Sequence, residues 1–330
     1  MSDIMPVWLN SLSRDGCFIV VGRAGIDLYP TPAGTQISSA NTFSSDVGGS
    51  AGNIAVALAR SGQNVELLSS LSTDAIGDFV ANNLRNYGVG LTYVGRTTGR
   101  QRTSLAIAEV NAEKPEVVIY RNNASDLTLN ETHLEKLPFA TAKAIIITGT
   151  ALSSEQANQQ LRRVAQNAND SGCPVVFDID YREMAWQSPN HAKSVISDFC
   201  PYVDLLVGND EEFAMLSGGS LSEGKSYAKK FATDIKVTLY KVGSSGCEIF
   251  WNHLGKHVSI YQVTAIKPFG AGDAFLGNLL SHLVHEQNWL EAIRTGAAAA
   301  AMVVSRQGCA SAMPDIESLR KFQSETKFGL

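Results

Sequence analysis

Short apolar runs alternate with longer amphipathic segments over the second half of the chain. Four runs rich in aliphatic and β-branched residues predict buried strands: 144–148, 175–179, 205–207 and 236–240. Segments between them place apolar residues at helical spacing: 155–168, 190–199 and 222–232. This regular alternation predicts a mostly parallel sheet that carries helices on both faces.

The first half of the chain combines one buried strand with stretches that belong to a smaller sheet. Residues 17–21 form an apolar run, and Asp27 follows at what should be the carboxyl end of that strand. The stretch 28–47 is rich in Thr, Ser, Pro and Gly. The β-rich runs 103–110 and 116–121 are joined by a hairpin signal. We expect these stretches to form a small sheet that lies over a site as a lid.

A glycine-rich turn at residues 267–275 leads into apolar residues at helical spacing, and the stretch 258–266 before it has the composition of a strand. Gly270 and Gly272 leave backbone N–H groups uncovered at the helix start, where the helix dipole also favours an anion. Asp273 lies in the same turn, and its charge would oppose a bound phosphate. A carboxylate beside an anion site indicates phosphoryl transfer more than simple phosphate binding.

The composition narrows the classes of partner. The chain has 330 residues, a net charge of −5 and a pI near 5.7, without a long basic run, so nucleic acid is not an expected partner. No apolar run is long enough to suggest a membrane span. The five cysteines are scattered and form no C-x-x-C pair, which is typical of a reducing compartment. We therefore expect a cytoplasmic protein.

Two other nucleotide-binding patterns fit the sequence less well. Residues 219–226 match the P-loop pattern G-x-x-x-x-G-K-[ST], with Lys225 as its lysine. An acidic, helix-like segment leads into the match instead of a buried strand, so we interpret it as a turn between helices. The dinucleotide pattern G-x-G-x-x-G requires a glycine where Phe275 stands.

Three separated motifs together resemble the ribokinase-like (PfkB-type) sugar kinases. They are the strand-end Asp27, the segment 48–53 and the late Gly270-Ala271-Gly272-Asp273. The resemblance runs from Val20 to Pro314. It implies a three-layer α/β/α fold around a mostly parallel sheet, with a small β-sheet lid.

The resemblance also implies how the chain is divided and which residues act. A single kinase domain would cover residues 1–330, with lid excursions at about 28–47 and 101–122. Asp273 would be the general base that takes the proton from the substrate hydroxyl. The amides of three residues would form the anion hole: Gly270, Ala271 and Gly272. Four residues would hold sugar hydroxyls: Asp27, Gly48, Gly49 and Asn53.

ATP and Mg²⁺ are the cofactors that the resemblance implies. Lys241, Gly243 and Gly246 follow a strand and resemble the nucleotide-binding loop of the family, although Gly246 also fits a hairpin turn. Asn209 and Glu212 resemble the N-x-x-E segment that helps to organise Mg²⁺ and phosphates, often through water. The same pair fits a capping box at a helix start, and both interpretations stay open.

Two arginines decide the expected substrate class. Arg121 and Arg182 each follow a tyrosine at the end of a strand-like run, where a solvated surface arginine is the alternative. A guanidinium binds a carboxylate through two parallel hydrogen bonds, so a sugar acid is the expected substrate.

Within the family, residues 22–28, 120–127, 148–152, 180–182 and 267–273 are similar to the kinases of myo-inositol catabolism. The implied reaction is transfer of phosphate from ATP to the 6-hydroxyl of 5-dehydro-2-deoxy-D-gluconate. The alternatives are a 2-keto-3-deoxygluconate kinase, another sugar kinase of the family, or a non-catalytic regulator that binds sugar acids.

Lys267 departs from the family pattern. Many members have Asp-Thr-Thr where this chain has Lys267-Pro268-Phe269, and that aspartate often helps to bind an activating monovalent cation. We expect the Lys267 ammonium to substitute for the ion. Lid sheets of the family often pair between subunits, which implies a homodimer through the lid.

Overall fold

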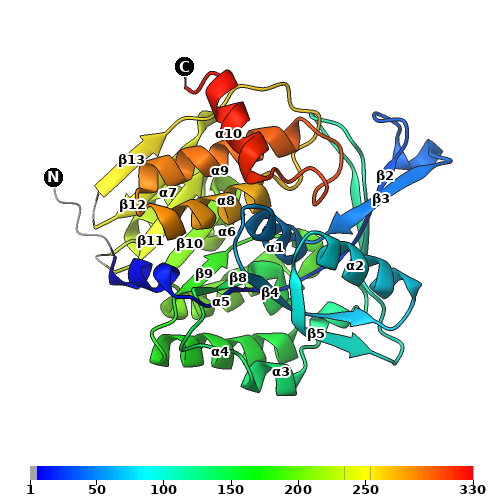
Figure 1. The fold of residues 1–330 in the computed structure, drawn as a ribbon, viewed down its shortest axis with the longest axis horizontal. Coiled ribbons are helices and arrows are strands. Elements are labelled where there is room, and N and C mark those ends of the chain that lie inside the picture. The colour runs from blue at the N-terminus through cyan, green and yellow to red at the C-terminus, as the bar shows by residue number, and fades with distance from the viewer. Residues whose placement is uncertain (1–5, 234, 253, 330) are drawn as a thin grey trace.

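The computed structural model describes residues 6–233, 235–252 and 254–329, so the outermost ends of the expected domain lie outside it. A nine-stranded sheet forms the middle layer, in the order β13-β12-β11-β10-β9-β8-β1-β4-β5 (Figure 1). Seven of its strands are parallel: β1 (Phe18–Val21), β4 (Val65–Ser72), β5 (Gly90–Thr97), β8 (Ala144–Thr148), β9 (Val175–Asp178), β10 (Leu205–Asn209) and β11 (Val237–Lys241). At one edge β12 (Cys247–Trp251) pairs antiparallel with β11, and β13 (Leu254–Val258) pairs antiparallel with β12.

Two layers of helices cover the sheet and complete the predicted three-layer architecture (Figure 1). One face packs against α1 (Ser50–Arg60), α2 (Ala75–Asn86), α8 (Ala271–His285), α9 (Trp289–Val304) and α10 (Ile316–Glu325). The other packs against α3 (Glu131–Glu135), α4 (Glu155–Asp170), α5 (Pro189–Phe199), α6 (Asp210–Ser217) and α7 (Leu221–Phe231). The strands are buried on both faces, which explains their continuous apolar runs.

The central strand β1 shows how one short run serves both layers. Phe18 and Val20 belong to the core under α1 and α8, whereas Ile19 and Val21 belong to the core under α4 and α5. Successive side chains of a strand point to opposite faces, so all four residues are buried.

A second, four-stranded sheet is built from the two stretches expected to form it. Its strands are β2 (Gly25–Pro30), β3 (Phe43–Gly48), β6 (Leu105–Ala108) and β7 (Val117–Tyr120), in the order β3-β2-β6-β7. β2 and β6 pair parallel, while β2–β3 and β6–β7 pair antiparallel. β2 and β3 extend to one side of the main body (Figure 1).

Two details of the structure differ from the sequence-based expectations. Residues 258–266 are not a strand: β13 ends at Val258, which pairs with Cys247 at the start of β12. Because β12 begins at Cys247, the residues after Val258 have no residue of β12 opposite them, and the strand pairing ends there. The strand β5 was not anticipated, and it extends the sheet beside β4.

The P-loop-like segment 219–226 lies where the sequence interpretation places it. It follows the C-cap of α6 at Gly218 and runs into α7, and Lys225 pairs with Glu248 at 2.6 Å. Because no strand precedes it, it lacks the context of a phosphate-binding loop. Separately, no helix within the described ranges is long and apolar enough to cross a membrane.

Candidate active site

Polar side chains gather where the parallel strands end. Asp178 is the last residue of β9, Asn209 the last of β10 and Lys241 the last of β11. α8 begins beside them at Ala271. Parallel strands end at one edge of a sheet, and that edge is where open α/β folds bind ligands.

The start of α8 has the features of an anion site. Gly270 is its N-cap residue with a φ of 76°, and no side chain caps the helix. The first main-chain bond of α8 runs from Ala274 N to Gly270 O, so the preceding amides have no partner within the helix. A Cβ at Gly272 would lie 3.1 Å from Lys241 Nζ, which places that ammonium beside the uncovered amides.

Asp273 and Asn53 meet at this helix start. Asn53 Nδ2 donates a hydrogen bond of 2.8 Å to Asp273 Oδ2, and Asp273 is 9% exposed. The pKa of Asp273 is raised to about 7, mainly by burial and then by the Asp180 charge, while the Asn53 hydrogen bond acts to lower it. A carboxyl group with a pKa near neutrality suits proton transfer at physiological pH.

A cluster of acids around Lys241 was not anticipated as part of the site. Lys241 Nζ lies 3.7 Å from Asp178 Oδ1. The pKa of Asp178 is raised to about 7, mainly by burial; Lys241 opposes this shift, while the charges of Glu212 and Asp180 add to it. Asp178 could have been found by the strand-end rule that was applied to Asp27, and Asp180 by its place two residues later. The expectation for Asp27 itself was wrong: it lies inside β2 of the small sheet, paired opposite Asp46, and not at the end of β1.

Asn209 and Glu212 form the capping box at the start of α6. Glu212 N donates to Asn209 Oδ1 at 2.8 Å, and Asn209 N donates to Glu212 Oε2 at 2.7 Å. Glu212 Oε1 also accepts a hydrogen bond of 3.0 Å from Tyr181 N. Both carboxylate oxygens therefore already bind backbone amides, and their role toward Mg²⁺ stays a prediction.

The acids at this edge fit a divalent ion only together with other ligands. Within the described ranges, no three side chains of His, Cys, Asp or Glu are placed to enclose a metal ion. Mg²⁺ in proteins keeps several waters and is commonly held by one or two carboxylates and substrate phosphates. The donor set near Asp178 and Glu212 fits that kind of site.

The predicted nucleotide loop is a tight turn between β11 and β12. Gly243 begins a short 3₁₀ segment, and Val242 N donates to Gly246 O at 2.8 Å. Gly246 thus occupies the hairpin turn that was its alternative interpretation. Its contact with nucleotide stays a prediction, while Lys241 lies further in, beside the start of α8.

The residues predicted to hold the sugar lie on the side of the small sheet. Asp27 in β2 is buried, and Tyr29 Oη donates to its Oδ2 at 3.2 Å. A Cβ at Gly48 would fall 1.8 Å from Asp27 Oδ1, so only glycine allows this approach. Gly49 has a φ of 91° and packs against the Arg23 carbonyl. Gly49 is the N-cap residue of α1, and Asn53 lies in the first turn of that helix.

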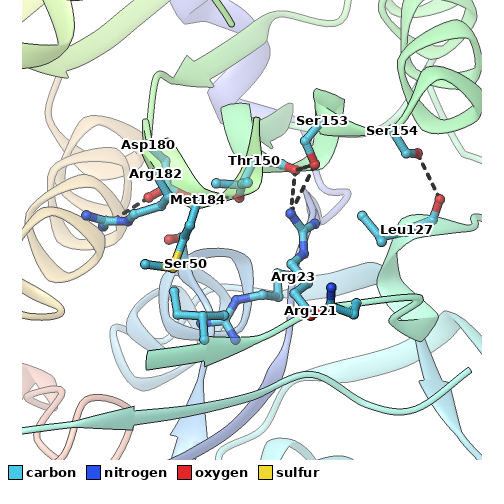
Figure 2. A pocket seen from close by; sticks show the side chains of 13 residues that line it. Arg23, Ser50, Arg121, Leu127, Thr150, Ser153, Ser154, Asp180, Arg182 and Met184 are labelled. Carbon is cyan, nitrogen blue, oxygen red and sulfur yellow. Dashed lines mark hydrogen bonds and ion pairs between the residues drawn. The ribbon is translucent and has the colours of Figure 1, made fainter. Parts of the chain in front are cut away.

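Three arginines line one pocket between the two sheets: Arg23, Arg121 and Arg182 (Figure 2). The Arg121 guanidinium donates to Asp126 Oδ2, to the Thr150 carbonyl and to Ser153 Oγ. Arg182 Nη2 lies 3.1 Å from Asp180 Oδ1. The structure thus brings Arg121 and Arg182 to a common pocket, although each already has an acidic partner.

Comparison with known proteins assigns the chain to a family. Residues 18–316 match the model described as pfkB family carbohydrate kinase. The chain belongs to this family. It is therefore a carbohydrate kinase, a phosphotransferase that acts on sugars, and this confirms the resemblance drawn from its motifs.

Several curated relatives carry the name 5-dehydro-2-deoxygluconokinase. The protein from Photobacterium profundum is 34% identical over 309 residues, covering 92% of this chain and 93% of the relative. The protein from Clostridium tetani is 31% identical and covers 94% and 93%. The protein from Geobacillus kaustophilus is 30% identical and covers 94% and 95%.

Solved structures confirm the ribokinase-like fold. A fructokinase from Xylella fastidiosa with bound ATP superposes with a TM-score of 0.82 at 22% identity, covering 94% of this chain and 98% of that one. An aminoimidazole riboside kinase from Salmonella enterica gives 0.80 at 22% identity, with coverage of 94% and 100%. At this level of identity the likeness concerns the fold alone.

Proposed function

We propose that this sugar kinase transfers phosphate from ATP to the 6-hydroxyl of 5-dehydro-2-deoxy-D-gluconate. The observation that carries the proposal is a pocket lined by three arginines near Asp273, whose pKa is raised to about 7 at the start of α8. A neutral sugar offers such a pocket no charge to bind, whereas a sugar acid does. The names of the curated relatives support the same substrate.

In this proposal Asp273 takes the proton of the substrate hydroxyl as the new phosphorus–oxygen bond forms. The amides of Gly270, Ala271 and Gly272 hold the oxygens of the transferring phosphoryl group. Lys241, beside Gly272, adds positive charge at the same point. The turn from Gly243 to Gly246 is the proposed contact to nucleotide.

Mg²⁺ is the proposed metal, and when bound with ATP it would neutralise charge on the phosphates. Asn209 and Glu212 would hold it through water, since the Glu212 oxygens already accept backbone amides. Asp178 lies on the neighbouring strand end and would face the same ion. These residues would orient waters of the ion instead of replacing them.

The small sheet is the proposed lid. Its excursions are at about 28–47 and 101–122; Asp27 lies in β2 just before the first, and Arg121, which lines the pocket, lies in the second. Closure of the sheet over a bound sugar acid would exclude water and limit hydrolysis of ATP.

ATP consumption screened over a panel of sugar acids and neutral sugars tests the proposal. We expect the highest kcat/KM for 5-dehydro-2-deoxy-D-gluconate, measured beside 2-keto-3-deoxygluconate. A higher kcat/KM for the second acid would make this a 2-keto-3-deoxygluconate kinase. Binding of acids without any ADP formation would indicate a regulator, and preference for neutral sugars would contradict the proposal.

A further inference from the structure

The three arginines of the pocket differ in how many hydrogen bonds their guanidinium groups already make within the protein. Arg121 is 11% exposed in its side chain and makes two hydrogen bonds to Asp126, at 2.8 and 2.5 Å. Two more reach the Thr150 carbonyl at 2.9 Å and Ser153 Oγ at 3.1 Å (Figure 2). A guanidinium has five N–H donors, so this one has a single donor left and cannot form a new fork.

Arg182 pairs with the acids beside the start of α8. Its side chain is 55% exposed and lies 3.1 Å from Asp180, two residues after Asp178. Asp178 in turn lies 3.7 Å from Lys241, whose Nζ is beside Gly272 of the proposed anion hole. This position suits an anionic phosphate more than a group at the far end of the sugar.

Arg23 is largely enclosed and makes few side-chain hydrogen bonds. Its side chain is 12% exposed; Nη1 donates to Ser104 Oγ at 3.3 Å, and Nη2 stays 3.9 Å from Asp27 Oδ1. Asp27 Oδ1 has no hydrogen-bond partner among the described residues. Arg23 therefore lines this pocket with hydrogen-bonding capacity unused, and the buried Asp27 Oδ1 beside it also makes no hydrogen bond to a described residue.

The backbone holds Arg23 firmly in this place. Gly52 N donates to the Arg23 carbonyl at 3.2 Å, and a Cβ at Gly49 would come within 2.4 Å of the same oxygen. Arg23 follows β1 of the large sheet. Its side-chain neighbours come from the small sheet: Asp27 lies in β2, and Ser104 directly precedes β6. The guanidinium thus lies at the junction of the two sheets.

The substrate of the proposed reaction has its two reactive ends far apart. Its 6-hydroxyl must lie at Asp273, and its C1 carboxylate is at the opposite end of a six-carbon chain. The group that binds the carboxylate therefore has to be a cation away from Asp273 with free donors. We propose that Arg23 is this group, oriented by Asp27, and that it determines the preference for sugar acids over neutral sugars.

This assignment rests on the proposed function and gives the other two arginines different roles. Arg121 ties Asp126 to the segment 149–153 and so builds the pocket wall. Arg182 remains with Asp180 near the transferring phosphate. Arg23 alone would then form the two-pronged contact with the carboxylate.

The test compares Arg23→Gln with the unaltered enzyme on the acid and on the matched neutral sugar in which the carboxylate is reduced to a primary alcohol. Loss of a charge-assisted fork should raise KM for the acid roughly 10- to 100-fold. KM for ATP and kcat/KM for the neutral analogue should stay within about twofold. Arg163→Gln is the matched control, because Arg163 is an exposed arginine that pairs with Glu131 outside this pocket and outside the lid.

Arg23→Lys provides a second variant that keeps the charge and loses the fork. Its KM for the acid should lie between those of the unaltered enzyme and of Arg23→Gln. If the glutamine variant does not fold, the lysine variant alone tests the proposal. Equal losses on the acid and the neutral analogue, or no loss on either, would overturn the role of Arg23. An unaltered enzyme that phosphorylates only neutral sugars would instead overturn the proposed function itself.

Discussion

Asn53 Nδ2 donates a hydrogen bond of 2.8 Å to Asp273 Oδ2, although the two residues lie 220 positions apart in the chain. The contact depends on close packing of α1 and α8. A Cβ at Gly277 would lie 2.6 Å from Ala57 Cβ, and Asn278 Oδ1 accepts a hydrogen bond of 2.7 Å from Ser61. The same packing that builds the core therefore holds the proposed base in place.

Asp273→Asn should lower kcat by about 10²- to 10⁴-fold, because the amide cannot accept the substrate proton. Binding of ATP should change little, since the anion hole is made of backbone amides. Steady-state kinetics and nucleotide binding by calorimetry measure the two effects. Lys225→Ala is the control: Lys225 pairs with Glu248 outside the site, and this variant should keep full activity. Normal turnover of Asp273→Asn would exclude Asp273 as the base.

The activity should rise with pH through neutrality. The pKa of Asp273 is raised to about 7, and only the ionised form can take a proton, so kcat/KM should fall below pH 7 and level off above it. This fall is the acidic limb of the pH profile of kcat/KM, which is measured with the sugar acid as substrate. A profile that is flat between pH 5.5 and 8.5, values chosen to span about 7, would contradict this role.

Two substitutions should shift the acidic limb of the pH profile in opposite directions. The hydrogen bond from Asn53 lowers the pKa of Asp273, so Asn53→Ala should shift the limb to higher pH. The charge of Asp178 raises it, so Asp178→Asn should shift the limb to lower pH. Shifts of roughly half a unit to one unit are expected for single interactions of this kind. Shifts of the same sign in both variants would indicate that another group titrates.

Gly48→Ala should weaken sugar binding. Its Cβ would fall 1.8 Å from Asp27 Oδ1, so Asp27 has to move away from its present position. We expect KM for the sugar acid to rise roughly 10- to 100-fold with little change in KM for ATP. Gly99→Ala is the matched control, because a Cβ there would meet only Gln101 Oε1 at 3.9 Å. Equal kinetics of the two variants would mean that the position of Asp27 is not critical.

Lys267 is a fully buried cation next to the anion hole. It is 0% exposed, and its Nζ donates to the Phe269 carbonyl at 2.7 Å, one residue before Gly270. We predict that this ammonium does the work of a monovalent cation. Lys267→Met should therefore lower kcat by roughly tenfold or more, while Lys267→Gln, which keeps a donor, should lose less.

The same idea predicts that the unaltered enzyme needs no added potassium. Titration of KCl against a bulky organic cation at constant ionic strength measures the dependence. A strong increase of kcat with potassium would contradict the substitution of the ion by Lys267.

Much of the fold could be predicted because its signals are local. The apolar run of β8 matched the observed Ala144–Thr148, and the helical spacing of 155–168 matched α4 to within two residues. The glycine turn before α8 and the acid in its first turn were equally visible, because their geometry depends on adjacent residues. The strand expected at 258–266 was wrong because pairing, and not composition, decided where β13 ends.

The residue types alone indicated the chemistry available at each strand end and at the start of α8. Which of these groups act on one another depends on how the elements pack. Arg121 looked free to bind a carboxylate, but the fold gives it Asp126 and the Thr150 carbonyl as partners. Arg23 belongs to the motif 22–28 and had no assigned role, yet its largely enclosed side chain lines the pocket beside Asp27. The physical reason is that periodicity reports whether a side chain is buried, whereas its partners come from elements that meet only when the two sheets are assembled.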